Sequence, residues 1–148
     1  MGYTVTIQQV APRWIAAAHG RAKPGEIART MLGLLDKVWP FVKQSGIKTD
    51  GLNVAIYTDR GIFAGAGVFE KFEPVGEIVC VASPSGSAAT VIHMGPYEKL
   101  GEAHQAVKDW SSANGHALEG TKWEVYGHHE DDPALRRTDI FYLLQESV

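Results

Sequence analysis

The order of the predicted elements repeats once along the chain, and this repeat constrains the fold more than any other feature of the sequence. Alternating apolar and polar residues predict strands, and apolar residues three and four apart predict helices. In the first half the patterns predict strands at 3–7 and 14–20, a helix that opens at 23–26 and ends at 45–46, and strands at 53–58 and 62–69. In the second half they predict strands at 77–82 and 88–94, a helix from 95 to 115, and strands at 122–127 and 138–144. The order strand-strand-helix-strand-strand therefore occurs twice.

Short sequence matches between the halves support a duplication. Asp36-Lys37-Val38-Trp39 resembles Val107-Lys108-Asp109-Trp110, Ser45-Gly46 resembles Asn114-Gly115, and Ala55-Ile56-Tyr57 resembles Glu124-Val125-Tyr126. The offset of about 70 residues is too long for a solenoid repeat. We therefore expect one domain over residues 1–148, with half-repeats at about 1–72 and 73–148. It should have an α+β fold with two helices, about eight antiparallel strands and a pseudo-twofold axis.

Composition and charge argue against several function classes. The 148 residues carry a formal charge of −3 without a dense cluster of Lys or Arg, so nothing favours binding to nucleic acid or to an anionic membrane. No apolar segment approaches the roughly 20 residues of a transmembrane helix. The single cysteine, Cys80, cannot form an internal disulfide, and no signal segment is recognisable, so we expect a cytoplasmic protein. The oligomeric state is left open.

Four segments resemble the GyrI-like small-molecule-binding domains. Residues 91–100 are similar to the H-x-G-P-Y-x-x-L segment that leads into the second helix of that family. Trp123-Glu124-Val125-Tyr126, followed by Asp131-Asp132-Pro133, is similar to the W/R-E-x-Y…DP segment. Residues 137–140 resemble the closing strand, and residues 64–68 resemble the G-V strand of the first half. The four segments occur in the family's order and cover nearly the whole chain.

The resemblance implies a ligand-binding function. The family supplies the ligand-sensing domain of multidrug-responsive transcription activators, where it follows a helix-turn-helix region. This sequence contains no such region and no basic recognition helix, so we expect a stand-alone member without direct binding to nucleic acid. The groove between the two halves is the ligand pocket in that family, and the acid at the position of Glu124 lies in it among aromatic residues.

Glu124 is the central candidate residue. On a strand, side chains alternate between faces, so Trp123 and Val125 share one face while Glu124 and Tyr126 share the other. The equivalent residue of the first half is Ala55, so the groove would carry an acid on one side only. A buried acid beside aromatic rings is expected to have a raised pKa. The alternative is an ordinary solvent-exposed acid on a surface strand.

Aromatic residues are the other candidates for ligand contact. Trp39 and Trp110 lie on the two helices and Tyr57 and Tyr126 on matching strands, so paired aromatic faces could flank the groove and accept a flat, apolar or cationic ligand. In the alternative, both tryptophans pack between helix and sheet. The family resemblance adds Tyr97 and Phe141 to the ligand-binding candidates, and His93, at the end of a strand just before Gly95-Pro96-Tyr97, is a further candidate to line the pocket.

The sequence favours neither a metal nor a cofactor. The six histidines lack the spacing of a helical zinc pair, and there is no H-E-x-x-H motif, no paired cysteine and no glycine-rich phosphate loop. A haem carrier of the related SOUL-type fold would need an axial ligand that the sequence does not single out. We therefore expect a site built from protein side chains alone.

Two functions from different classes fit these residues. The first is a binding module for a small aromatic or cationic molecule, with Glu124 as the acid of the pocket. The second is implied by stand-alone family members that hydrolyse reactive cyclopropane-bearing natural products in detoxification. In such an enzyme Glu124 would be the general base on water, and Tyr126 or Tyr97 would orient that water or donate to the oxygen that gains charge. The sequence alone does not separate them, and we favour the binding module.

Overall fold

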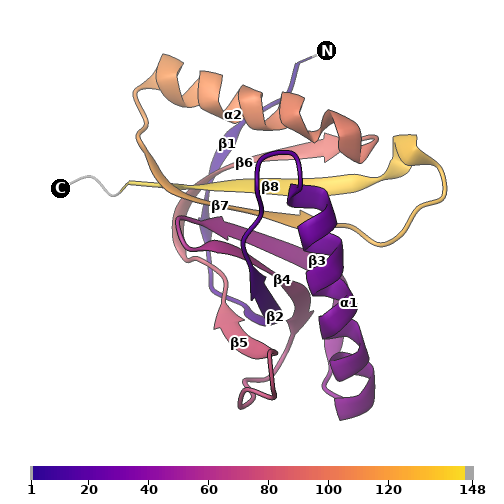
Figure 1. Ribbon diagram of the computed structural model, residues 1–148. Coiled ribbons are helices and arrows are strands. Elements are labelled where there is room, and N and C mark those ends of the chain that lie inside the picture. Colours follow the sequence, from indigo (N-terminus) through magenta and orange to yellow (C-terminus); the bar gives the residue numbers. More distant parts are fainter. Residues whose placement is uncertain (1, 146–148) are drawn as a thin grey trace.

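The computed structural model describes residues 2–145, which form one antiparallel sheet and two long helices (Figure 1). The strands are β1 (Thr6–Val10), β2 (Trp14–Gly20), β3 (Thr49–Thr58), β4 (Gly61–Val68), β5 (Val79–Ala82), β6 (Gly86–Met94), β7 (Leu118–Tyr126) and β8 (Arg137–Leu144). The helices are α1 (Ile27–Ser45) and α2 (Leu100–Asn114), with short 3-10 turns η1 (Tyr97–Lys99) and η2 (Pro133–Leu135). The predicted α+β class with two helices and eight antiparallel strands is confirmed.

The order of the strands reveals the pseudo-twofold symmetry. The sheet runs β1-β6-β8-β7-β3-β4-β2-β5, and exchanging each strand for its equivalent in the other half reverses this order and leaves it otherwise unchanged. Strands β3 and β7 meet at the centre. The first strand of each half pairs with the other half, β1 with β6 and β5 with β2. The two halves are therefore interlocked through their first strands as well as joined at the centre.

Both helices cover the same face of the sheet, each over its own half. Helix α1 packs on β2 and β4, and α2 packs on β6. Both helices end at a glycine in the left-handed conformation, Gly46 and Gly115, a common C-terminal cap. Counting back from these glycines makes the fully buried Val38 and Val107 equivalent. Neither helix packs on β7, and α1 makes few contacts with β3, so the central strands form the floor of a groove between the helices.

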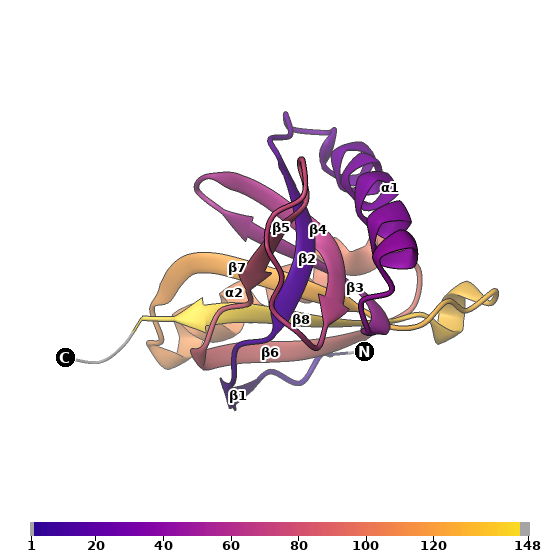
Figure 2. The same ribbon diagram turned by 90° about the horizontal axis from the view of Figure 1, so that it is seen from below.

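On the face without helices, the two ends of the twisted sheet pack against each other. Its apolar cluster combines residues from both ends of the sheet with Trp123 at the centre, namely Ile15, Ala17, Val54, Ile56, Ala88 and Trp123. Strong right-handed twist makes this possible, because it turns β2 and β4 nearly across β6 and β8 (Figure 2). Trp123 is 4% exposed, so its side chain is buried on the face of the sheet opposite to Glu124.

Several predicted element boundaries were wrong. The first strand lies at Thr6–Val10, where it pairs with β6, and not at 3–7. Helix α1 begins at Ile27 and passes through Pro40 without ending. The segment predicted to begin the second helix forms the 3-10 turn η1 before α2. Within residues 2–145, no helix is long and apolar enough to cross a membrane.

Candidate functional site

A cavity of ≈ 660 Å³ lies in the groove between the helices. Its floor includes Tyr57, Glu124 and Tyr126 from the central strands β3 and β7. One wall comes from α1, and the other comes from η1 and the start of α2. The walls are mostly apolar and include Ile27, Met31, Leu32 and Leu35 on the α1 side and Tyr97, Leu100 and His104 on the other.

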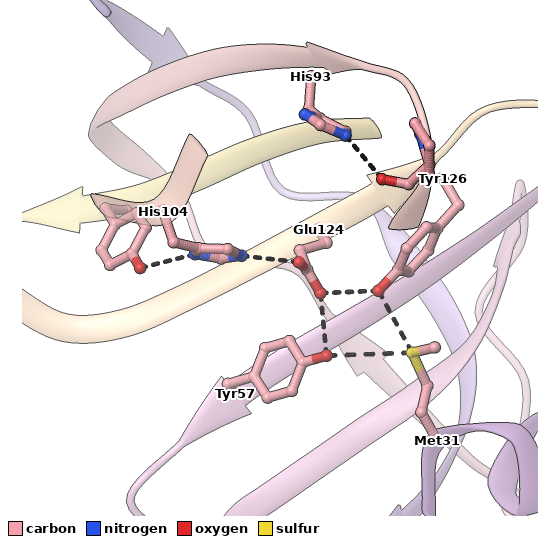
Figure 3. A network of polar contacts seen from close by, with 8 residues as sticks. Met31, Tyr57, His93, His104, Glu124 and Tyr126 are labelled. Atoms are coloured by element: carbon pink, nitrogen blue, oxygen red, sulfur yellow. Dashed lines mark hydrogen bonds and ion pairs between the residues drawn. The ribbon is translucent and has the colours of Figure 1, made fainter. Parts of the chain in front are cut away.

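Glu124 lies at the centre of a hydrogen-bond network on this floor (Figure 3). Its side chain is almost fully buried, with the residue 4% exposed. The hydroxyls of Tyr57 and Tyr126 both donate to Oε1, at 2.9 and 2.7 Å. The sulfur of Met31 lies 3.3 Å from the Tyr126 hydroxyl and 3.9 Å from the Tyr57 hydroxyl, and so closes the network on the α1 side.

His104 contacts the other carboxylate oxygen. Its Nε2 lies 2.8 Å from Glu124 Oε2, and its Nδ1 lies 2.7 Å from the Tyr142 hydroxyl. A carboxylate only accepts hydrogen bonds, so Nε2 carries a proton and donates it. The carboxylate therefore has three donors from three elements, namely β3, β7 and α2.

The pKa of Glu124 is lowered, which contradicts the prediction of a raised value. Burial is the largest single influence and acts to raise the pKa of Glu124, as the sequence argument assumed. The hydrogen bonds from His104, Tyr126 and Tyr57, together with the charge of His104, act in the other direction and outweigh burial. Burial and the nearby carboxylate raise the pKa of Tyr57 and Tyr126. The result is an ionised carboxylate held by two protonated tyrosines at neutral pH.

This network should make folding stability depend on pH in acid. Because the folded-state pKa of Glu124 is depressed, its contribution is fully present above the unfolded glutamate pKa of about 4.3 and is lost as pH falls through the folded-state value. Urea unfolding from neutral pH into strong acid should therefore show a steeper loss of stability in the wild type than in Glu124→Gln. Equal slopes for the two proteins would contradict the depressed pKa.

The pseudo-twofold axis passes through the site, and the chemistry on its two sides differs. In the register of β3 on β7, Ala55 lies opposite Glu124, Asn53 opposite Tyr126 and Tyr57 opposite Lys122. The equivalent pairs, with the first-half residue first, are Tyr57 and Tyr126, Ala55 and Glu124, Leu35 and His104, and Asn53 and Lys122. The two tyrosines are symmetric and donate to one carboxylate. The ionisable residues Glu124, His104 and Lys122 all come from the second half.

Four of the eight residues predicted for ligand contact line the cavity, namely Tyr57, Tyr97, Glu124 and Tyr126. Tyr97 packs edge-on against Tyr126, with 5.7 Å between ring centroids. The guanidinium of Arg136 lies over the Tyr97 ring, 5.4 Å from its centroid.

The two tryptophans on the helices do not line this cavity. Trp39 packs into the core beneath α1 and donates from Nε1 to Asn53 at 2.8 Å. Trp110 stacks on His116 near the end of α2, with 4.9 Å between ring centroids. Counting back from Gly46 and Gly115 also shows that they are not equivalent, because Trp39 matches Lys108. The matching of the two tryptophans was wrong.

Phe141 and His93 also lie outside the cavity. Phe141 stacks on Trp123 on the opposite face of the sheet, with 5.0 Å between ring centroids. His93 is 2% exposed. Its Nε2 lies 3.0 Å from the carbonyl oxygen of Pro96 (Figure 3). Its Nδ1 lies 2.9 Å from the Tyr3 hydroxyl. His93 thus holds the turn that places Tyr97 at the cavity.

Sequence reasoning missed His104, Lys122 and Met31. The signal for His104 was available, because it lies at the helix position equivalent to Leu35 and faces the sheet. Lys122 shares the strand face of Glu124, two residues away. Met31 belonged to the apolar stripe predicted for the first helix, and its contact with the tyrosines depends on where that helix crosses the sheet. Within residues 2–145, no group of three or more His, Cys, Asp and Glu side chains is placed to hold a metal ion.

Comparison with known proteins gives a likeness in fold. No family model and no curated protein matches the sequence. The structure is similar to EcmrR in its complex with DNA, with a TM-score of 0.84 and 19% identity; the match covers 98% of this chain and 58% of that one. It is also similar to the EcmrR C-terminal domain alone, with a TM-score of 0.73, 20% identity, and coverage of 99% and 100%. The chain thus spans well under two thirds of the EcmrR chain and all of its C-terminal domain.

Two further solved structures share the fold. SAV2435 bound to tetraphenylphosphonium matches with a TM-score of 0.60 and 14% identity, covering 98% of this chain and 94% of that one. A hydrolase from Listeria innocua matches with a TM-score of 0.62 and 11% identity, covering 97% and 93%. At these identities the comparisons define the fold.

Proposed function

We propose that this chain is a GyrI-like effector-binding domain that holds a small aromatic or cationic molecule in the cavity between its halves. The main observation that supports this proposal is the ionised carboxylate of Glu124 at the floor of an aromatic and apolar cavity of ≈ 660 Å³. That volume lies within the range of about 300–1,000 Å³ that suits a drug-sized ligand. Such sites combine apolar walls with a few fixed polar groups, as this one does.

The network explains how the cavity would favour a cation. The three donors keep Glu124 ionised, and the two tyrosine donors on Oε1 add no positive charge, so this side of the carboxylate stays negative on the cavity floor. The rings of Tyr57, Tyr126 and Tyr97 surround it and offer faces and edges to a flat or aromatic ligand. A cation held among these rings gains from both the charge and the aromatic faces.

The fold comparisons are compatible with this proposal. SAV2435 binds tetraphenylphosphonium, a cation with four aromatic arms. EcmrR forms a complex with DNA, and its C-terminal domain corresponds to this whole chain. The domain proposed here would supply the ligand-binding part of such an arrangement, or act as a stand-alone binding protein in the cytoplasm.

Tetraphenylphosphonium provides the test of this proposal. It should bind the wild type, and Glu124→Gln should weaken that binding by about tenfold while leaving the affinity for a neutral aromatic compound nearly unchanged. Isothermal titration calorimetry measures both affinities. Glu102→Gln is the matched control, because it removes one charge from the exposed surface of α2 and should leave both affinities unchanged. Equal affinity of the cation for wild type and Glu124→Gln would remove Glu124 from the proposal.

Hydrolysis of a strained electrophile is the second candidate, and the ionised state of Glu124 favours it. A carboxylate that stays charged at neutral pH can accept a proton from water, and Tyr126 lies 2.7 Å from it. The three donors that hold Glu124 also make it a weaker base, which is why we place binding first. Incubation with a cyclopropane-bearing electrophile and analysis of the products separates the two functions. An enzyme would consume the compound over many turnovers and lose that activity in Glu124→Gln.

A further inference from the structure

We propose that Lys122 is a second recognition group in the cavity, and that the ligand is an aromatic compound with an anionic group that accepts hydrogen bonds from Lys122 Nζ. This inference rests on the proposed function, since it assumes that the cavity between the helices is the ligand site. It adds the chemical class of the ligand. A ligand that also carries a positive charge would be a zwitterion, with its cationic end toward Glu124.

Strand pairing places Lys122 beside the tyrosines of the site. Lys122 lies on β7, opposite Tyr57 of β3 on one side and Tyr142 of β8 on the other. Side chains two residues apart on a strand share a face, so Lys122 faces the cavity with Glu124. Its Nζ is 5.7 Å from the centroid of the Tyr57 ring and 5.7 Å from that of the Tyr142 ring. Two aromatic rings on neighbouring strands thus hold the ammonium group at the cavity wall.

Within the part of the chain that the structure describes, no acceptor takes a hydrogen bond from the Lys122 ammonium group. Among residues 2–145, no side chain forms an ion pair with Lys122. Aromatic rings attract the charge but offer no lone pair to its three N–H donors. Lys122 is half-buried, and a ligand that fills the cavity would remove water from it. An ammonium left without water or an acceptor is costly, so a ligand that brings an acceptor is selected over one that does not.

Glu124 and Lys122 differ in how many hydrogen-bonding positions they leave available to a ligand. Three of the four lone-pair positions of the Glu124 carboxylate are already occupied by Tyr57, Tyr126 and His104. Glu124 therefore acts on a ligand mainly through its charge. None of the described residues accepts a hydrogen bond from Lys122, so the directional hydrogen bonds that fix the ligand's orientation should come from Lys122.

The surrounding charges are consistent with an anion site at Lys122. Burial and the nearby Lys108 lower the pKa of Lys122, while Glu124 opposes that effect. Lys108 lies on α2 outside the cavity lining and adds to the positive field at this end of the groove. An incoming carboxylate or sulfonate would relieve the repulsion between the two lysines and replace the lost water.

Three naphthalene probes with different charges test the inference: 2-naphthoate, neutral 2-acetylnaphthalene and 2-naphthyltrimethylammonium. Titration calorimetry should show that wild type binds the anion, and that Lys122→Met weakens this binding about tenfold to a hundredfold. The affinity for the neutral probe should change less than about twofold, because methionine keeps the apolar stem of the side chain. Lys122→Arg should retain most of the affinity for 2-naphthoate.

Lys108→Met is the matched control, because it removes one positive charge near the groove without touching the cavity. Equal weakening of 2-naphthoate by Lys108→Met and Lys122→Met would mean a general field effect and overturn the inference. Equal weakening of all three probes by Lys122→Met would mean lost packing and also overturn it. Thermal unfolding checks that each variant is folded, and Lys122→Gln replaces Lys122→Met if that variant is not.

The same titrations separate this inference from the proposed function. If wild type binds the cationic and neutral probes but not 2-naphthoate, the anion site is wrong and the cavity remains a ligand site. If wild type binds none of the three probes and no tetraphenylphosphonium, both proposals are contradicted.

Discussion

Replacing Trp123 by alanine should lower the free energy of unfolding by about 3–5 kcal/mol, the usual cost of truncating a buried tryptophan. Trp123 is 4% exposed and belongs to the cluster that joins both ends of the sheet. Its ring stacks on Phe141 with an interplanar angle of 7°. Truncation would leave a void that the surrounding strands cannot close, because their backbones are held by pairing on both sides.

Urea unfolding followed by circular dichroism measures this effect without relying on tryptophan fluorescence. Trp110→Ala is the matched control, since Trp110 stacks on His116 at the edge of α2 and is only partly buried. It should cost about 1 kcal/mol, the order expected for one aromatic pair. A loss for Trp123→Ala no larger than that for Trp110→Ala would show that the back face of the sheet is not a packed core.

Replacing Glu124 by alanine should lower the free energy of unfolding by about 2–4 kcal/mol, whereas Glu124→Gln should cost about 1 kcal/mol or less. Alanine removes the acceptor for Tyr57, Tyr126 and His104 together and leaves these donors in a buried site. Glutamine keeps an oxygen that can accept from the tyrosines. Its amide can donate to Nε2 of His104 if the imidazole proton moves to Nδ1 and is donated to Tyr142.

The first half of the chain provides the control for this prediction. There the equivalent positions hold Ala55 and Leu35, an apolar pair without donors that need a partner. The double variant Glu124→Ala/His104→Leu copies that pair and should recover part of the stability lost in Glu124→Ala. Urea unfolding of the two single variants and the double variant gives the coupling energy, which should be at least about 1 kcal/mol. Additive losses would contradict the network as a cooperative unit.

The fold class followed from the sequence because the relevant signals are local. Alternation, helical spacing and the capping glycines Gly46 and Gly115 define elements of about the right length and in the right order. Strand alternation also separated Trp123 from Glu124 correctly, since that rule depends only on the backbone. The pairing of β1 and β5 with strands of the opposite half, β6 and β2, was not predictable in this way. It depends on pairing between segments far apart in the chain.

The residues of the candidate site were likewise predictable only where local pattern decides their orientation. Glu124, Tyr126 and Tyr57 could be placed on one face of two matching strands from sequence alone, and they line the cavity. Trp39 and Trp110 could not be oriented, because the direction of a helical side chain depends on where the helix crosses the sheet. Both turned out to pack elsewhere.

The sequence by itself determined a duplicated α+β fold with one acid on a strand face shared with Tyr126. Only the tertiary structure decided the state of that acid and its partners. His104 comes from α2, 20 residues before Glu124, and Tyr57 comes from the other half, 67 residues away. Their hydrogen bonds outweigh the effect of burial and reverse the predicted direction of the pKa shift. The physical reason is that burial can be inferred from a local pattern, whereas the donors that stabilise a buried charge are brought to it by the fold.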